Sequence, residues 1–252
     1  MNIREKRETI HQKLETMKKC YLERNMSNFN LFYDTFFDRS RPPVIIGTDN
    51  GVWYCTMDQI YRLIAYDWDR WGKVEIDTWN FTIHETEDHD MVRARGILDF
   101  GENRAWDLDL VMIFNASGRD YRCRLMQFKI PRNEIRPAVV LNESRAEQNR
   151  SETEMKYLKA LNGNVSEDLM REHLVGSVQK MLRDHRPYLV NVDVRKEMIF
   201  IEENGDGYLF ALTGYCIHQE RNELVPFRVV GIGEGYKVLD AEFSLPFASE
   251  LG

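Results

Sequence analysis

The residue types that could abstract a proton in this sequence are three aspartates on expected strands, Asp99, Asp107 and Asp109. An isomerase-type reaction needs a carboxylate base near a substrate C–H bond. It also needs a neutral donor, such as the hydroxyl of Tyr54, for the oxyanion that forms. Side chains alternate along a strand, and Asp99 shares its parity with Arg93 and Arg95. This pattern predicts a solvated or ion-paired Asp99, which a β-bulge would turn inward.

Histidine and cysteine spacings indicate no further catalytic or metal chemistry. His84 stands alone on an expected strand beside Glu85, and His89 falls in an expected turn, where it would be solvated. No two histidines have metal-ligand spacing, so we predict no metal site and no cofactor. No GxSxG or Cys/His nucleophile pattern is present. The Gly-x-Gly-x-Gly run at 231–235 precedes an expected strand, which favours a hairpin turn over a phosphate-binding loop.

Aromatic residues of the first half supply the other candidates for ligand binding. Trp53 and Tyr54 follow an expected turn and could line the mouth of a pocket, although core packing is the alternative for each tryptophan. Gln127 lies on an expected strand, where it could orient a ligand or satisfy a backbone group. The candidate ligand-binding residues are Trp53, Tyr54, Trp106, Gln127, Asp99 and His84.

Composition limits the classes of partner. The chain has 252 residues, 43% hydrophobic and 12% aromatic, which predicts a folded protein of one large or two small domains. Its net charge of −7 and lack of a basic run argue against nucleic acid and membrane surfaces as partners. No signal-type or membrane-spanning apolar run is present. The four cysteines form no CxxC pair. We therefore expect reduced thiols and a cytoplasmic location.

Helical periodicity and caps mark three helices before residue 73. Apolar residues at 3, 10, 14, 17 and 21 predict a helix over about 3–25. A short helix over 29–37 and a strand over 44–47 should follow. Thr56 and Gln59 form a capping box that opens the third helix.

From residue 73 the period changes to two, which predicts strands at 74–85, 91–100, 106–115 and 121–130. The first half is thus three helices and an antiparallel meander. The polar stretch 142–150 is the expected linker, and a helix follows it to about residue 161. Another helix, from 166 to about 182, should precede strands at about 190–203, 207–218, 224–232 and 236–245. The predicted domains are 1–135 and 145–252.

The two halves share an internal similarity. The run Tyr121–Pro131 lines up with Tyr236–Pro246, and the segments beginning at Ile83 and Met91 have counterparts 117 residues later. The helix–strand order is also the same in both halves. We therefore predict a tandem duplication in which one chain forms an intramolecular pseudo-dimer. The second copy has no clear equivalent of 43–53.

The first half, over about 8–131, resembles the nuclear transport factor 2-like superfamily, in particular its SnoaL-like branch. The segments that carry the resemblance are Phe32–Phe37, Val44–Trp53, Met57–Trp71 and Val74–Asp77. The resemblance implies an α+β fold of cystatin-like architecture, a cone-shaped curved antiparallel sheet packed on helices around a pocket. It also implies pairing of two such sheets. Family members include isomerases, cyclases, dehydratases, binding modules and transport adaptors, so the fold does not assign a function.

Three functions compete on this basis. The leading hypothesis is a protein that binds a small apolar or carbonyl-containing molecule in the first-domain pocket without established catalysis. The second is an enzyme of the isomerase, cyclase or dehydratase type that works by proton transfer. The third is a protein-interaction module in which the face of Arg93 and Arg95 meets acidic residues such as Glu202, Glu203 or Glu242. Homo-oligomerisation is a further expectation.

Overall fold

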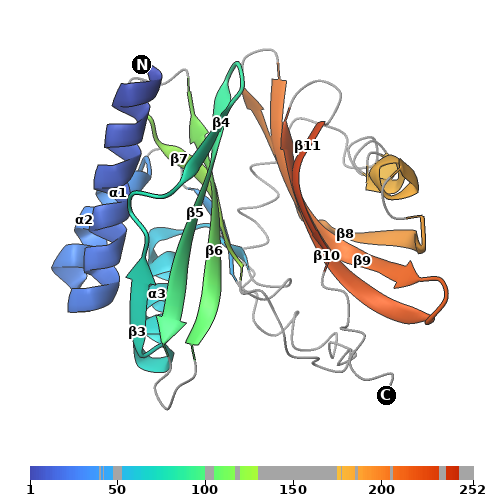
Figure 1. Cartoon of the computed structure of the whole chain (residues 1–252), viewed down its shortest axis with the longest axis horizontal. Helices are drawn as coiled ribbons and strands as arrows, with labels where there is room; N and C mark the ends of the chain where they lie inside the picture. Colours follow the sequence, from blue (N-terminus) through green and yellow to red (C-terminus); the bar gives the residue numbers. More distant parts are fainter. Residues whose placement is uncertain are drawn as a thin grey trace. The chain divides into compact units, whose positions relative to one another are not determined.

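The computed structural model of the chain describes residues 1–39, 41, 43–47, 53–99, 105–116, 120–129, 175–176, 178–184, 187–204, 207–232 and 237–243 (Figure 1). These residues form two compact units, one up to residue 129 and one from residue 175. The expected linker at 142–150 and the helices expected between 151 and 174 lie outside the described residues. The domain boundaries therefore stay predictions.

Three helices of the first unit confirm the sequence-based expectation: α1 (Ile3–Glu23), α2 (Met26–Phe36) and α3 (Met57–Arg70). The capping box of Thr56 and Gln59 is present at the start of α3. The buried stripe of α1 differs from the expected one, because Ile3 is exposed whereas Lys6 and Lys13 are buried. These lysines lie four residues before and three residues after Ile10, so helical spacing places all three on one face.

The helices are followed by a seven-stranded sheet in the order β2-β1-β7-β6-β5-β3, with β4 also paired to β5. Its strands are β1 (Val44–Ile46), β2 (Trp53–Tyr54), β3 (Lys73–Ile76), β4 (Thr82–Glu85), β5 (His89–Asp99), β6 (Ala105–Asn115) and β7 (Cys123–Lys129). The expected all-antiparallel sheet is wrong at one position, since β1 pairs with β7 in parallel. The chain between β1 and β7 is long enough for the crossover that a parallel pair needs.

The expected strand over 74–85 is divided into β3 and β4. The carboxylate of Asp77 interrupts it, because its Oδ1 accepts the backbone N–H groups of Trp79 at 3.0 Å and Asn80 at 2.9 Å. Such bonds give the backbone an alternative to the ladder and make a turn. After the turn, β4 pairs with one half of β5 and β3 with the other.

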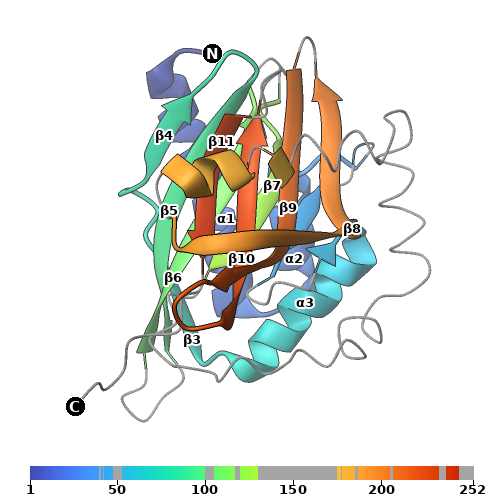
Figure 2. The ribbon, with the colours of Figure 1, turned by 90° about the vertical axis from the view of Figure 1, so that its right-hand side faces the viewer.

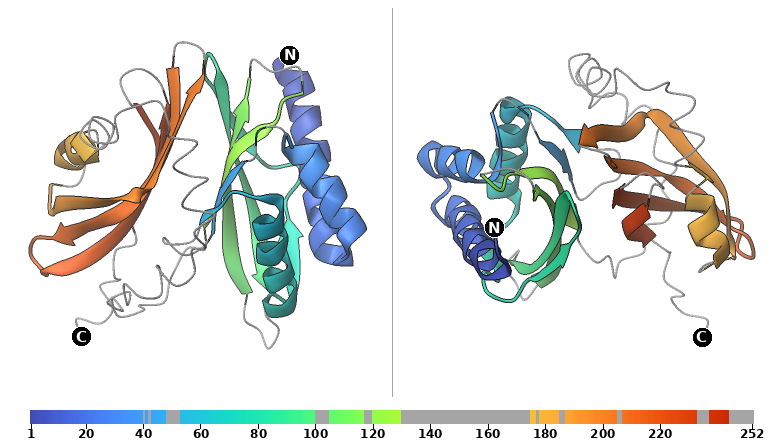
Figure 3. Two further views of the ribbon diagram at one scale, coloured as in Figure 1. Left: turned by 180° about the vertical axis from the view of Figure 1, so that it is seen from behind. Right: turned by 90° about the horizontal axis from the view of Figure 1, so that it is seen from above.

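The helices pack against one face of this sheet, and the strands curve around them (Figure 3). The core between them is rich in aromatic side chains from each layer: Tyr21, Phe29, Phe32, Phe36, Trp71, Phe114 and Phe128. Aromatic rings dominate core energetics because each buries a large apolar area. The aromatic residues of the first half therefore serve largely as core.

In the second unit, residues 178–184 are helical and precede a four-stranded antiparallel sheet in the order β11-β10-β9-β8 (Figure 2). The strands β8 (Leu189–Asn204), β9 (Gly207–His218), β10 (Glu223–Ile232) and β11 (Lys237–Phe243) agree closely with the expected ones. Val178 and Leu182 belong to a core cluster with sheet residues such as Leu212 and Phe227. A helix thus packs on a sheet in both units, while the tandem duplication stays a prediction.

Replacing Gly96 with alanine is expected to destabilise the first unit by about 1–3 kcal/mol, as overpacking does. A Cβ at this β5 position would lie 2.6 Å from the backbone oxygen of Glu75 on β3. The measurement is urea unfolding followed by tryptophan fluorescence, which reports on the first unit because all five tryptophans lie there. A Gly96→Ala variant as stable as the wild type would contradict the expectation.

Candidate functional site

The predicted proton-transfer residues do not lie inside the fold. His84 on β4, Asp99 on β5 and Asp107 on β6 are all exposed to solvent. Asp99 shares its exposed face with Arg95, as the strand alternation indicated. None of these three side chains can therefore act as a base toward a molecule held in the interior.

Trp53 and Gln127 are buried, but they lie on the sheet face opposite the helices. Met126 and Phe128 belong to the core under the helices, so the alternation of side chains turns Gln127 the other way. Ile46 pairs with both Trp53 and Gln127, which places the two candidates in one row across β2, β1 and β7. The Trp53 indole N–H and both polar atoms of the Gln127 amide are buried, and they have no hydrogen-bond partner among the described residues.

Tyr54 and Trp106 are partly buried and pack against the helix-side core. The six candidate residues are therefore distributed over two faces of the sheet and the solvent, and they do not form one site. The six residues are not brought together because each residue's face depends on strand parity and register, which its neighbours in the sequence do not reveal.

A different part of the first unit forms an open cleft of about 350 Å³. It lies where α1, the end of α2 and the segment leading into β7 meet. The cleft is lined by Thr9, Gln12, Lys13, Asp34, Thr35, Asp120 and Arg122. Thr9, Gln12 and Lys13 face the cleft together because they are three and four residues apart on α1.

Two cationic side chains meet the end of α2 in this cleft. The last carbonyl groups of a helix have no partner within the helix and carry partial negative charge. The Lys13 amine donates a hydrogen bond to the backbone oxygen of Thr35. Arg122 Nη1 donates to the backbone oxygens of Asp34 and Thr35, the latter at 2.9 Å. One role of Lys13 and Arg122 is therefore to cap α2.

Lys13 is in an unusual electrostatic environment for a lysine. Its residue exposure is 4%, and its Nζ also lies 5.9 Å from the centroid of the Phe36 ring. Burial is the largest cause that lowers the pKa of Lys13 to about 8; the charge of the nearby Arg122 guanidinium acts in the same direction, and Cys123 and Asp120 act in the opposite direction. An uncharged amine is thus accessible to Lys13 near neutral pH.

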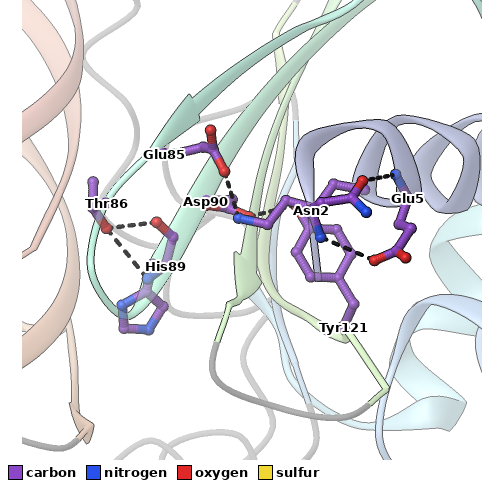
Figure 4. A network of polar contacts seen from close by, with 8 residues as sticks. Asn2, Glu5, Glu85, Thr86, His89, Asp90 and Tyr121 are labelled. Atoms are coloured by element: carbon purple, nitrogen blue, oxygen red, sulfur yellow. Dashed lines mark hydrogen bonds and ion pairs between the residues drawn. The ribbon is translucent and has the colours of Figure 1, made fainter.

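Two turns earlier on α1, Lys6 takes part in a different arrangement with Glu85, Asp90 and Tyr121. Figure 4 shows these three partners with their labels. Lys6 Nζ lies 2.7 Å from Glu85 Oε1 and 2.7 Å from Asp90 Oδ2. Tyr121 donates its hydroxyl to the same Asp90 oxygen at 2.8 Å. Burial by itself would lower the pKa of Lys6, but the hydrogen bonds to Asp90 and Glu85 together with the negative charges of these carboxylates raise that pKa overall. The second oxygen of Asp90 is buried and has no hydrogen-bond partner within the described part of the chain.

The structure corrects the expectation that His89 is solvated in a turn before the strand. Strand β5 begins at His89, and both His89 and Asp90 are buried. Asp90 has the same parity as Val92 and Ala94, which belong to the helix-side core. This parity was the sequence signal that Asp90 is buried. It was missed because the strand was expected to begin at residue 91. For Lys13, the corresponding signal was its spacing from Ile10 and Met17.

The described residues also lack a metal-binding cluster and a membrane-spanning helix. That part of the chain holds no group of three or more His, Cys, Asp or Glu side chains placed to hold a metal ion. It also contains no helix long and apolar enough to cross a membrane. The four cysteines all lie within it, are buried and form no disulfide.

No protein-family model matches the sequence, and no curated protein matches it either. Solved structures with a similar fold include an NTF2-like (nuclear transport factor 2-like) protein of unknown function from Pseudomonas putida KT2440, at 10% identity over 48% of this chain and 82% of that one, with a TM-score of 0.38. Another, from Shewanella oneidensis MR-1, has 15% identity over 48% and 97%, with a TM-score of 0.35.

A phenazine biosynthesis-related protein from Pseudomonas aeruginosa has 12% identity over 60% of this chain and 88% of that one, with a TM-score of 0.34. At these identities a likeness concerns the fold alone. The expected fold class is confirmed by the elements of the first unit, three helices against a curved, mainly antiparallel sheet. The first half of the chain has an α+β fold, in which three helices pack on one face of a curved sheet.

Proposed function

We propose that the first unit binds a small molecule with a carbonyl or carboxylate group in the cleft beside Lys13 and Arg122. The observation that carries the proposal is the presence of two cationic donors in an open cleft of about 350 Å³. Ligand sites commonly have volumes of roughly 300–1,000 Å³ and a few well-placed polar groups. We also propose that the chain is related to the SnoaL-like branch and that it is located in the cytoplasm.

The lining residues favour a neutral or singly charged ligand. Lys13 and Arg122 offer N–H donors, and Thr9 adds a hydroxyl, so the complementary ligand group is an oxygen acceptor. Asp34 and Asp120 also line the cleft, and Asp34 is ion-paired with Arg39. A multiply charged anion would meet these carboxylates, whereas a carbonyl or a single carboxylate would not be strongly repelled.

Binding is expected to raise the thermal unfolding midpoint in a panel of monocarboxylates, ketones, aldehydes and 2-oxo acids. A ligand that binds only the folded state stabilises it by about 2.7 kcal/mol at a concentration of 100 times Kd. Arg122→Gln should remove the shift for an active compound. Arg95→Gln is the matched control, because Arg95 is exposed on β5 away from the cleft.

Arg122 also holds the end of α2, so its replacement could lower stability by itself. Thr9→Val removes one cleft hydroxyl while it keeps the shape of the side chain, and it should weaken the shift without loss of fold. The proposal is overturned if no panel compound shifts the midpoint, or if both cleft variants keep the full shift.

A further inference from the structure

We infer that Lys13 is a nucleophilic amine that forms a reversible imine with an aldehyde or a 2-oxo acid held in the cleft. This inference rests on the proposed function, because it assigns the chemistry of the same ligand site.

Two buried lysines on one face of α1 differ in the way their charge is balanced. Lys6 has two carboxylate oxygens at 2.7 Å, so its ammonium form is stabilised. Among the described residues, no carboxylate oxygen lies within 4 Å of Lys13 Nζ, and its hydrogen-bond acceptor is the neutral carbonyl of Thr35. A buried ammonium group without a counter-ion is costly, and the amine avoids that cost by losing its proton.

This environment supplies the form of lysine that attacks carbonyl carbon. With a pKa of about 8, roughly a tenth of Lys13 is uncharged at pH 7. For a solvated lysine the uncharged fraction at that pH is on the order of one in several thousand. The charged groups that face Lys13 are Arg122 and Asp120, and the Cys123 thiol lies nearby. Desolvation beside another cation is a recognised way to activate a lysine.

Arg122 is placed to hold the carboxylate of a 2-oxo acid. Its Nη1 and Lys13 Nζ both donate to the same Thr35 oxygen, so the two nitrogens lie within roughly 6 Å of each other. Among the described residues, none accepts a hydrogen bond from the other guanidinium nitrogens of Arg122. A guanidinium fork binds a carboxylate through two parallel hydrogen bonds. The carbonyl carbon next to that carboxylate would then face Lys13.

The reaction balances without a further reactant. The lone pair of uncharged Nζ attacks the carbonyl carbon, and the carbonyl π electrons move to oxygen, which takes up a proton released by the nitrogen. The carbinolamine nitrogen then releases its second proton, with which the hydroxyl group leaves as water while the C=N bond forms. The net change is one amine and one carbonyl compound to one imine and one water, and hydrolysis reverses it.

The test uses the full chain with glyoxylate as the probe and sodium cyanoborohydride as the hydride donor that reduces an imine to a stable amine. Lys13 is expected to gain a carboxymethyl group at least tenfold faster than exposed Lys19 at pH 7, as measured by peptide mass spectrometry. Lys6 should stay unlabelled, which makes it an internal control on the same helix. Lys13→Arg should lose the fast labelling, and Lys19→Arg should keep it.

The wild-type chain provides a second measurement that does not depend on the folding of a variant. The labelling rate of Lys13 should rise with pH to a plateau with a midpoint near 8. Labelling of Lys13 no faster than that of Lys19, or a midpoint above about 10 as for a solvated lysine, overturns the inference. A thermal shift by glyoxylate or pyruvate without Lys13 labelling would overturn the imine alone. If neither a thermal shift nor labelling of Lys13 is observed, the proposed ligand site is overturned as well.

Discussion

Asp67→Asn is expected to remove a loss of stability that the wild-type protein shows as the pH rises from about 4 to 8. Asp67 lies on α3 with 3% exposure, and Tyr21 of α1 donates its hydroxyl to Asp67 Oδ2 at 3.0 Å. Burial raises the pKa of Asp67 to about 8, although the Tyr21 hydrogen bond acts in the opposite direction. A neutral asparagine can accept the same hydrogen bond at every pH.

The direction of the effect follows from proton binding. The unfolded chain releases the Asp67 proton near the ordinary aspartate pKa of about 4, and the folded protein keeps it until about pH 8. Between these values the folded state binds more protons, so rising pH favours unfolding by up to about 1.4 kcal/mol per pH unit. The full window corresponds to a loss on the order of 5 kcal/mol.

The measurement is urea unfolding by tryptophan fluorescence at pH 5, 7 and 9 for wild type and Asp67→Asn. The difference in unfolding free energy between the two proteins should grow with pH in favour of the variant. Taking this difference cancels the contributions of other titrating groups, which both proteins share. Asp69→Asn is the control, because Asp69 lies on the same helix and is exposed. Parallel pH profiles for wild type and Asp67→Asn would show that Asp67 is not the titrating group.

The second large effect concerns the ion pair between Lys6 and Asp90. Lys6→Met is expected to lower stability by about 3–5 kcal/mol, because it leaves a buried carboxylate without its counter-ion. The side chain of Asp90 has no exposure and that of Lys6 has 8%. Tyr121 would still donate to Asp90, but one neutral donor does not replace a charge at 2.7 Å. The unfolding free energy at pH 7 is the quantity to measure.

A double-mutant cycle separates the ion pair from lost packing. Asp90→Asn in the Lys6→Met background removes the unpaired charge and keeps an acceptor for Tyr121, so it should recover much of the stability. Lys73→Met is the matched control, because Lys73 and Glu75 form an exposed ion pair, which contributes about 0–1 kcal/mol at most. If Lys6→Met costs no more than Lys73→Met, the buried pair is not a major source of stability.

Local patterns in the sequence are sufficient to specify most elements of this protein. The helical period and the capping box at Thr56 predicted α1 and α3, and the period of two predicted the main strands of both units. These signals are local because a helix turn or a strand face involves residues only a few positions apart. The α+β fold class of the first half followed from the order of these elements.

Tertiary structure decided which side chains share a site. The parallel pairing of β1 with β7 joins segments about 80 residues apart, and it places Gln127 in one row with Trp53 on the face opposite the helices. The start of β5 at His89 turns Asp90 toward Lys6. The end of α2 receives Lys13 and Arg122 from two distant segments. These positions depend on register and on the desolvation of charge in the folded core, and neither quantity is set by neighbours in the sequence.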